Sequence, residues 1–541
     1  MEFLVSRLPV ENLPCVAYED DDFLVVNKPA GISTHAPSPY AGDGIYEFLR
    51  RREARWASLA IIHRLDKETS GVMVFSKSSR ANRSLTRQFT DHTVRKVYEL
   101  ETDRAVSFTT KEIESALVRA GPRYLVRPPH AGPEIAVTRF HFLKQTPRGT
   151  YLWQAEPLTG KTHQIRAQAA FIGLPICGDT LYGGTSGPRV CLHAAEISLA
   201  DPEGKPFHFH IDADFAADPR ENLRRSMVDS ALTTASRLIH GMADGWPGWY
   251  VDRLGDYLLS QSESPLTAGQ ESWLRIHADS LGCRAAYNKI LTRKLAPAMP
   301  DEVSPRLVFG PAAPEEFVVL ENGVRFLTSF SEGYSAGLFL DQRENRRRWL
   351  AGNYDVAVPI FPPGSESPPD VLNTFAYTCG FSVCAAKAGA RVTSLDLSRK
   401  YLDWGKRNFL ENGLDPAKHD FIFGDVFDWC KRLAKKGRTF DAIILDPPTF
   451  SRSKEGGVFR VEKDFPKLLA AALPLLKSPG LIFASSNAAP WRAEEFADML
   501  KTRVIACGRS MRSFLYVAQP FDFPIHPLES AHLKSAWLSL A

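Results

Sequence analysis

The first residues that could do chemistry form one short block, His63-Arg64-Leu65-Asp66-Lys67-Glu68-Thr69-Ser70-Gly71, which lies between two apolar runs. Asp66 is a carboxylate among charged and hydroxyl residues, so it is a candidate nucleophile or a candidate group for stabilising a cation. Polar residues between two strands usually form only a turn, and Asp and Ser-Gly favour one. The block alone therefore leaves a turn and a catalytic site as alternatives.

Further polar blocks along the chain favour the catalytic interpretation. They are Lys28-Pro29-Ala30-Gly31, Lys96-Val97-Tyr98, Gly160-Lys161-Thr162-His163-Gln164-Ile165-Arg166, Gly178-Asp179, Tyr182-Gly183 and Leu192-His193-Ala194. In order and spacing, over about residues 15–212, these blocks resemble the RluA family of pseudouridine synthases. The resemblance implies an α+β catalytic domain with a mixed sheet that isomerises uridine to pseudouridine in RNA and needs no cofactor.

The resemblance assigns four residues to this reaction. Asp66 matches the catalytic aspartate, which attacks the nucleoside or stabilises a sugar cation while the glycosidic bond moves to carbon-5. Arg166 matches the arginine that keeps this carboxylate ionised where burial would favour its protonated form. Arg64 matches the residue that fills the space left by the flipped-out uridine. Tyr98 matches the residue that stacks on the uracil and can take the proton from carbon-5. Taken singly, Tyr98 could be a core tyrosine and Arg166 a surface residue of a helix.

A second group of candidate residues lies at the ends of predicted strands in the C-terminal part. Val371–Gly380 (VLNTFAYTCG) is a strand that runs into a loop, and the next strand ends at Asp396. A cofactor with an adenosyl group binds at such strand ends, where an acidic residue can hold the ribose hydroxyls. Asp425 ends a third strand and could accept a hydrogen bond from the adenine amino group, and Asp446–Phe450 (DPPTF) follows a fourth. For Asp396 and Asp425, each taken alone, helix capping is the alternative.

Together these segments resemble a class I methyltransferase, and over about residues 225–541 they are similar to the RlmI/RlmK-like group of ribosomal RNA methyltransferases. Gly245–Asp252 (GWPGWYVD), Gly337–Arg343 (GLFLDQR) and Asn345-Arg346 match that group's central domain and bridging helix. The blocks DLSRKYLDWGKRNF and LDPPTFSRSK are the most specific. The resemblance implies S-adenosylmethionine as the cofactor, bound by Asn373, Phe375, Tyr377, Gly380, Asp396, Leu397, Asp425, Asp446 and Pro447.

One position departs from the pattern of this group. The group has Tyr-Thr-Gly where this chain has Tyr377-Thr378-Cys379. If the backbone at this position has a positive φ, Cys379 strains the loop by about 1–3 kcal/mol. The departure bears on the affinity for the cofactor, although Gly380 is retained.

A missing cysteine limits which atom of the base can accept the methyl group. Methylation of cytosine at carbon-5 requires a thiolate that adds next to that carbon. In the cytosine-methylating relatives this cysteine follows the fifth strand, where the present chain has Phe483-Ala484-Ser485-Ser486-Asn487. A base nitrogen with its own lone pair is therefore favoured, and we predict guanine nitrogen-7, as in the RlmK-like guanine methylators. Transfer to such an atom needs positioning more than acid–base catalysis. Asp446 with Pro447-Pro448 would orient the base, and Phe450 could stack on it.

The elements around these blocks predict three domains. Short apolar runs broken by Gly and Pro, such as Phe23–Val26, indicate a strand-rich α+β pseudouridine synthase domain over residues 1–215. The polar stretch Ala216–Arg225 leads out of it. Residues 226–330 mix a helix with short strands and form a small α+β central domain. Over residues 331–541 apolar runs alternate with helical stretches, which predicts a Rossmann-like α/β methyltransferase domain with a parallel sheet.

The composition is that of an ordinary globular protein, with 44% hydrophobic and 24% charged residues. A formal net charge of +4 permits binding to RNA but does not indicate it. The eight cysteines form no CxxC pair, which argues against a zinc site and against disulfides and indicates a reducing compartment. The chain has no recognisable signal peptide and no run that approaches about 18 apolar residues. We therefore expect a cytoplasmic protein that binds neither a membrane nor a metal.

These observations predict a bifunctional enzyme whose partner is RNA, with large-subunit ribosomal RNA expected and transfer RNA as the alternative. Two other functions stay open. The methyltransferase half could act only as an RNA-binding module, and Cys379 makes it the half more prone to have lost activity. A protein or small-molecule methyltransferase is less favoured, because glutamine methylators carry Asn-Pro-Pro-Tyr where this chain has Asp-Pro-Pro-Thr. The sequence leaves the oligomeric state undetermined and is compatible with a monomer.

Overall fold

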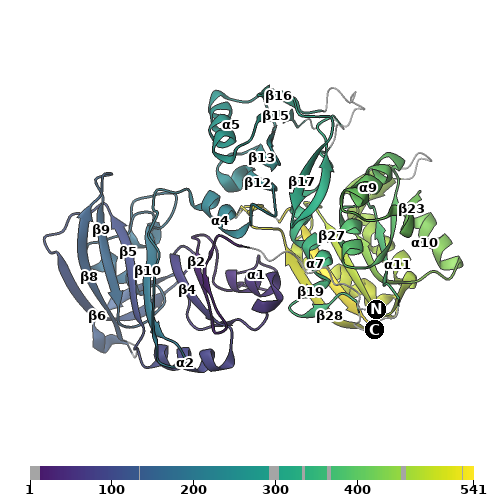
Figure 1. The fold of residues 1–541 in the computed structure, drawn as a ribbon. Helices are drawn as coiled ribbons and strands as arrows, with labels where there is room; N and C mark the ends of the chain where they lie inside the picture. Colours follow the sequence, from purple (N-terminus) through teal and green to yellow (C-terminus); the bar gives the residue numbers. More distant parts are fainter. Residues whose placement is uncertain are drawn as a thin grey trace. The chain divides into compact units, whose positions relative to one another are not determined.

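The computed structural model describes residues 12–132, 135–291, 304–331, 335–361, 367–452, 458–526, 528–529 and 531–541. Contacts between Cα atoms divide the chain into two units, which are coloured from purple to teal and from teal to yellow in Figure 1. The first unit contains Asn12–Pro37 and Asp43–Asp229, and the second contains Ser38–Gly42 and Ser230–Ala541.

The first unit is built on one sheet of eleven strands with the order β1-β2-β4-β10-β5-β9-β8-β6-β7, to which β3 and β11 add at β4 and β10. The strands are β1 (Val16–Glu19), β2 (Phe23–Lys28), β3 (Ala60–Ile61), β4 (Ser70–Ser76), β5 (Arg95–Thr102), β6 (Thr110–Ala120), β7 (Arg123–Arg127), β8 (Ile135–Gln145), β9 (Tyr151–Pro157), β10 (Leu192–Ala200) and β11 (Pro206–His210). β4 and β10 pair in parallel, whereas the other pairs are antiparallel, so the sheet is mixed as predicted. Every residue of β4 is buried, which explains its nearly continuous apolar sequence.

Four helices accompany this sheet: α1 (Ile45–Arg52), α2 (Ser79–Thr90), α3 (Gln164–Phe171) and α4 (Pro219–Met227). α2 begins where the Ser78 hydroxyl accepts a hydrogen bond from the Ala81 N–H, a typical N-cap. The polar stretch Ala216–Arg225, which we predicted to lead out of the domain, lies largely in α4. Asp218 caps α4, Met227 is buried, and the contacts place the helix in the first unit. The charged residues are therefore those of an amphipathic surface helix.

The second unit begins with a central sheet of five strands in the order β12-β13-β14-β15-β16. These strands are β12 (Ala235–His240), β13 (Trp249–Leu254), β14 (Tyr257–Ser262), β15 (Ala285–Ile290) and β16 (Arg306–Phe309). β14 and β15 pair in parallel, and α5 (Ala268–Leu281) forms the connection between them. A hairpin of β17 (Phe317–Glu321) and β18 (Val324–Thr328) follows. Strands and one helix thus form a small α+β element, as expected.

A sheet of seven strands in the order β23-β22-β21-β24-β27-β29-β28 completes the second unit. The strands are β21 (Asp370–Thr374), β22 (Arg391–Asp396), β23 (Asp420–Phe423), β24 (Phe440–Leu445), β27 (Leu476–Ser486), β28 (Met511–Ala518) and β29 (Lys534–Leu540). The five predicted strands pair in parallel. β29 pairs antiparallel with both β27 and β28. The sequence did not predict β28 and β29.

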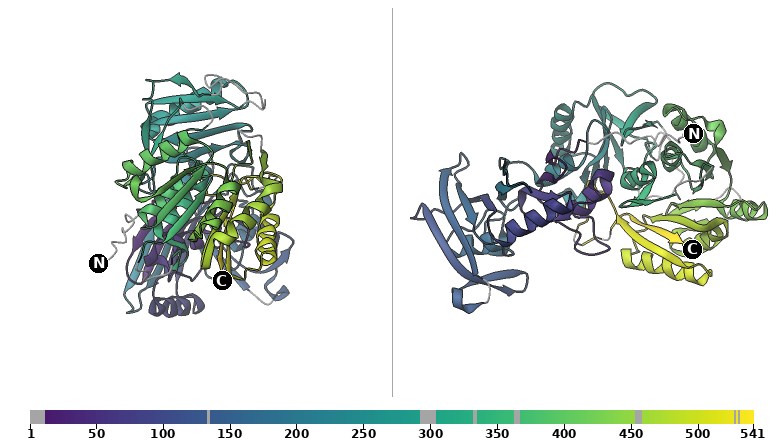
Figure 2. Two further views of the ribbon diagram at one scale, coloured as in Figure 1. Left: turned by 90° about the vertical axis from the view of Figure 1, so that its right-hand side faces the viewer. Right: turned by 60° about the horizontal axis from the view of Figure 1, so that its bottom comes forward.

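Helices cover both faces of this sheet (Figure 2). They are α7 (Arg343–Ala351), α8 (Gly380–Lys387), α9 (Arg399–Glu411), α10 (Val426–Lys435), α11 (Val461–Ala472) and α12 (Ala493–Ala506). Neighbouring residues of β24 point to opposite faces, since side chains alternate along a strand. Ile444 packs in the core cluster that includes side chains of α7, α8 and α9, and Ile443 packs in the cluster that includes α10, α11 and α12. The predicted Rossmann-like α/β fold is therefore confirmed.

α7 is almost entirely buried although it carries four arginines. Arg343 donates two hydrogen bonds of 2.7 Å to the carboxylate of Asp522. Arg346 binds both oxygens of Glu321 on β17 at 2.6 and 2.7 Å. Buried charges need such paired partners. The two ion pairs tie the beginning of α7 to β17 and to Asp522.

Candidate active sites of the two units

Asp66 lies in the loop between β3 and β4, on the wall of a cavity of about 720 Å³ in the first unit. Arg64, Tyr98 and Arg166 line the same cavity. The structure thus brings together all four residues that the sequence predicted for one site. Gly71 makes the loop possible: its φ is 119°, and a Cβ at this position would lie 2.2 Å from the Ala194 carbonyl oxygen of β10.

Arg166 is the fixed cation of this site. It is buried on α3, and its Nε and Nη2 donate to the two oxygens of Asp179 at 2.6 and 2.9 Å. Its Nη1 lies 3.4 Å from Asp66 Oδ2 and 3.4 Å from Glu68 Oε2. Burial alone would lower the pKa of Arg166, but the carboxylates of Asp179, Asp66 and Glu68 raise it overall. The guanidinium is therefore charged and oriented with one nitrogen toward Asp66.

The role of Asp179 was missed by sequence reasoning, although the Gly178-Asp179 block was recognised. Its side chain is only 1% exposed and reaches Arg166 from the turn before Thr180–Tyr182. His163 was also missed as an individual residue. Its Nε2 lies 3.9 Å from Asp66 Oδ2, and its Nδ1 forms a 2.9 Å hydrogen bond with the Tyr182 hydroxyl. Burial lowers the pKa of His163, although Asp66 acts in the opposite direction.

Tyr98 and Arg64 occupy different parts of the cavity wall. Tyr98 projects from β5, and both burial and the charge of Asp66 raise the pKa of its phenol. A phenol that stays neutral stacks well but accepts a proton poorly, so this environment favours the stacking role. Arg64 is exposed and is therefore accessible to RNA.

Lys28 binds backbone carbonyls around the loop that carries Asp66. Its buried ammonium donates to the carbonyls of Pro29 at 3.0 Å, Ile32 at 2.8 Å and Lys67 at 3.4 Å. Burial lowers the pKa of Lys28 to about 7, although Asp66 and Glu68 act to raise it. The Lys28-Pro29-Ala30-Gly31 block therefore supports the backbone next to the Asp66 carboxylate.

The predicted cofactor residues lie at or just after the carboxyl ends of four neighbouring strands, β21, β22, β23 and β24. In the loop after β21, Phe375, Tyr377 and Cys379 all have left-handed backbones, with φ of 55°, 49° and 64°. Strained residues of this kind cluster at ligand sites. Cys379 thus has the positive φ that would strain this loop, and its left-handed backbone costs about 1–3 kcal/mol. The side chain fits because residue 405 of α9 is a glycine, where a Cβ would lie 2.3 Å from Cys379 Sγ.

Asp396 and Asp425 both bind backbone N–H groups. Asp396 Oδ2 accepts from Tyr377 N–H at 2.8 Å and its Oδ1 from Ser398 N–H at 2.7 Å, so it orders the strained loop. Burial raises the pKa of Asp396, which the backbone hydrogen bonds partly offset. Asp425 Oδ1 accepts from Phe427 and Asp428 and caps α10. The structure thus shows the capping alternative for Asp425, and its contact with a cofactor stays a prediction.

Asp446 ends β24 and is bound by two neutral donors. Its Oδ1 accepts from Ser485 Oγ at 2.5 Å and from Gln342 Nε2 at 3.0 Å. Gln342 also donates to Ser485 Oγ at 3.1 Å and accepts from Asn345 Nδ2 at 2.7 Å. Burial raises the pKa of Asp446 to about 6, although these hydrogen bonds lower it. Gln342 was missed by sequence reasoning, although the GLFLDQR block that contains it was recognised.

Among the described residues, no group of His, Cys, Asp and Glu is arranged to hold a metal ion. All eight cysteines are free thiols. No helix in the described part of the chain is long and apolar enough to cross a membrane.

Comparisons with known proteins match a different family in each of the two units. Residues 22–171 match the RNA pseudouridylate synthase family, and residues 297–524 match the S-adenosylmethionine-dependent methyltransferase family. The fold and the two sites thus define an enzyme with two catalytic domains, an RNA pseudouridylate synthase and an S-adenosylmethionine-dependent methyltransferase.

Individual relatives identify the family more closely. A ribosomal RNA large subunit methyltransferase from Deinococcus radiodurans is 32% identical over 317 residues, which cover 57% of this chain and 73% of the relative. The ribosomal RNA large subunit methyltransferase I from Aeromonas salmonicida is 32% identical over 379 residues, which cover 68% of this chain and 90% of the relative. Methyltransferase K from Neisseria meningitidis is 38% identical over 177 residues, 32% of this chain and 46% of the relative. The chain belongs to the family of ribosomal RNA large subunit methyltransferases and carries a pseudouridine synthase domain in addition.

Proposed function

We propose that the chain modifies large-subunit ribosomal RNA in the cytoplasm at two nucleotides. The first domain forms pseudouridine with Asp66, and the second transfers a methyl group to guanine nitrogen-7 beside Asp446. The observation that carries the choice of acceptor is the hydrogen bond from Ser485 to Asp446. The resemblance implies that a cytosine methylator carries its thiolate after the fifth strand, whereas here no cysteine lies in β27 or in the loop that follows it, and the Ser485 hydroxyl of β27 is committed to a neighbouring carboxylate. The names of the relatives support the class of RNA.

In the pseudouridine reaction, Asp66 acts as an ionised carboxylate at the sugar while the bond between the sugar and uracil breaks. Arg166 Nη1, 3.4 Å away, stabilises that charge, and Asp179 prevents the guanidinium from turning away. Tyr98 stacks on the uracil while it turns to present carbon-5 to the sugar. Arg64 at the cavity wall takes the place of the flipped-out base in the RNA.

The second site fits S-adenosylmethionine. A strained loop at Phe375–Cys379 and a carboxylate at the end of the adjacent strand are features of an adenosyl site. Asp396 would hold the ribose hydroxyls, and Asn373, Gly380, Leu397 and Pro447 would surround the remainder. When bound, the cofactor supplies an activated methyl group.

Guanine nitrogen-7 carries no proton, so its lone pair can attack without a general base. The side chains around Asp446 suit this requirement, because the neutral donors Ser485 and Gln342 hold the carboxylate in place. Their task is to orient the acceptor base, and the half-exposed Phe450 can stack on it.

The test is nucleotide-resolution mapping of pseudouridine and 7-methylguanine in large-subunit RNA treated with the full chain. Asp66→Asn is expected to remove only pseudouridine, and Asp446→Ala only the methyl mark. The methylated RNA should become cleavable by borohydride and aniline, because nitrogen-7 methylation makes the purine cationic. An adduct trapped with RNA that contains 5-fluorocytosine would contradict the guanine assignment. Pseudouridine without any methyl mark would support the RNA-binding-module alternative.

A further inference from the structure

A second cavity, of about 780 Å³, lies between the central strands and the seven-stranded sheet of the second unit. Phe339 and Asp341, just before α7, line it together with Asn487 after β27 and His532 before β29. Its volume is in the range of pockets that bind small ligands. We propose that this cavity receives the flipped-out target guanine and that Asp341 reads the Watson–Crick edge of the base. This inference rests on the methylation function proposed above.

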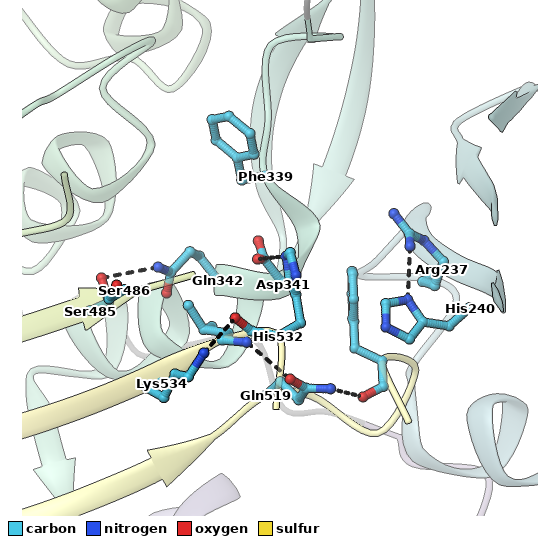
Figure 3. A network of polar contacts seen from close by, with 12 residues as sticks. Arg237, His240, Phe339, Asp341, Gln342, Ser485, Ser486, Gln519, His532 and Lys534 are labelled. Atoms are coloured by element: carbon cyan, nitrogen blue, oxygen red, sulfur yellow. Dashed lines mark hydrogen bonds and ion pairs between the residues drawn. The ribbon is translucent and has the colours of Figure 1, made fainter. Parts of the chain in front are cut away.

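Asp341 and Gln342 are neighbours in the chain whose side chains point in opposite directions (Figure 3). Gln342 points toward Ser485 and binds Asp446, the carboxylate of the proposed transfer site. Asp341 points the other way, toward the cavity and His532. Asp341 is joined by one peptide bond to Gln342, the residue that positions Asp446. A base bound by Asp341 would therefore lie in a fixed relation to Asp446.

The carboxylate of Asp341 is suited to accept hydrogen bonds. It is buried, and its Oδ2 lies 3.4 Å from Nε2 of the half-exposed His532. Burial alone would raise its pKa, but the hydrogen bond with His532 and the charges of Arg346 and Arg237 lower the pKa overall. An ionised carboxylate only accepts hydrogen bonds. Asp252 lines the cavity too, but Arg237 already binds both of its oxygens, at 2.5 and 3.1 Å.

Guanine is the base whose edge matches such a carboxylate. Its Watson–Crick edge presents two adjacent donors, N–H at nitrogen-1 and the amino group at carbon-2, which a carboxylate can accept side by side. Adenine and cytosine place an acceptor nitrogen beside their amino group, and uracil flanks its N–H with two carbonyls. A guanine read on this edge presents nitrogen-7 on its opposite side, away from Asp341. Flipped bases are commonly read on the Watson–Crick edge and stacked on aromatic side chains.

The cavity also offers an aromatic face and fixed walls. Phe339 is 48% exposed, and its ring lies 5.2 Å from the ring of Tyr377 in the cofactor loop. Arg346 fixes the backbone of Phe339 through a 2.7 Å hydrogen bond to its carbonyl. The buried Lys534 donates to the carbonyls of Ala488 at 2.6 Å and His532 at 3.5 Å, so it joins two loops that line the cavity (Figure 3). A base in this cavity would lie beside the cofactor loop on a preformed surface.

The test uses the full chain and a short RNA around the methylated nucleotide, prepared with guanine, inosine or 7-deazaguanine at that position. Inosine lacks only the carbon-2 amino group, so the wild-type protein should methylate it about ten- to a hundredfold less efficiently than guanine. In Asp341→Asn the ratio of guanine to inosine rates should fall toward one. Glu529→Gln is the matched control: it removes a carboxylate that lines the same cavity at an exposed position, and the ratio should not change.

The outcomes separate this inference from the function on which it rests. Equal methylation of guanine and inosine by the wild-type protein would overturn the reading role of Asp341, and this measurement does not depend on the folding of a variant. A merely structural role for Asp341 would lower both rates and leave their ratio unchanged, which would also overturn the inference. Methylation of 7-deazaguanine would instead show that nitrogen-7 is not the acceptor, and the proposed function would fail.

Discussion

Replacement of Asp446 by Asn tests whether the buried carboxylate of the second site lowers the free energy of unfolding. Burial raises the pKa of Asp446 to about 6 from the ordinary 3.8. At about 1.4 kcal/mol per pH unit, this difference corresponds to about 3 kcal/mol. The folded state binds the proton more tightly than the unfolded state. Ionisation of Asp446 therefore lowers stability as the pH rises from about 4 to about 6.

Asp446→Asn stays neutral at every pH and can still accept hydrogen bonds from Ser485 and Gln342. We expect the variant to match the wild type near pH 4 and to exceed it by up to about 3 kcal/mol at pH 8. Hydrogen exchange of peptides from β24 and β27 in the full chain measures this locally, since the two units need not unfold together. Asp403→Asn, an exposed site on α9, is the control and should change stability by less than about 0.5 kcal/mol.

The reasoning is refuted if the stability difference between Asp446→Asn and wild type is the same at pH 4 and pH 8, because the gain would then not come from ionisation. The rate of methyl transfer gives a second measurement. If the ionised form of Asp446 positions the base, the wild-type rate should fall as the pH decreases through about 6. A rate of methyl transfer that is independent of pH between 5 and 8 would show that the charge of Asp446 is not needed to position the base.

Four other predictions follow from the two sites. Asp66→Asn should abolish pseudouridine formation and leave RNA binding nearly intact, and retention of more than a few per cent of the turnover would contradict the assignment. Asp179→Asn leaves the buried Arg166 without its bidentate partner, so it should lower the stability of the first unit by about 3–5 kcal/mol and reduce pseudouridine turnover, measured by hydrogen exchange and tritium release. Asp396→Ala should weaken S-adenosylmethionine binding about ten- to a hundredfold in calorimetric titration, and an unchanged affinity would move the ribose contact elsewhere. Division of the chain before Ser230 should give two folded fragments, each with its own activity, whereas an unfolded C-terminal fragment would show that the units depend on each other.

The sequence predicted the parts of the fold that depend on local pattern. Ser398 caps α9 and the helix ends at Asn412-Gly413, and both residue types favour these positions. The five parallel strands follow from alternating apolar and helical stretches. Such features are encoded within a few residues of where they occur. The Ala216–Arg225 stretch, which we predicted to lead out of the domain, forms most of helix α4 near the end of the first unit, because a charged amphipathic helix and an exposed linker have similar compositions.

Pairings between distant side chains could not be predicted in this way. Gln342 and Asp446 are 104 residues apart, and their hydrogen bond depends on how α7 packs against the sheet. Asp179 is 13 residues from Arg166, but a short turn decides where its side chain points. Motif reasoning located the blocks that contain these residues and gave them no role. In each case only the three-dimensional structure shows which side chain is the partner.

The two proposed catalytic carboxylates differ in their partners, and the difference matches the chemistry assigned to them. Asp66 lies 3.4 Å from the charged guanidinium of Arg166, which Asp179 holds in place. The positive charge of Arg166 at this distance can stabilise a carboxylate that reacts with a sugar. Asp446 instead binds the neutral donors Ser485 and Gln342, and burial keeps its pKa near the physiological range. A group that only orients a base need not be a strong nucleophile, so neutral hydrogen bonds suffice. In the proposed mechanism, one chain thus holds one carboxylate for reaction and another for alignment.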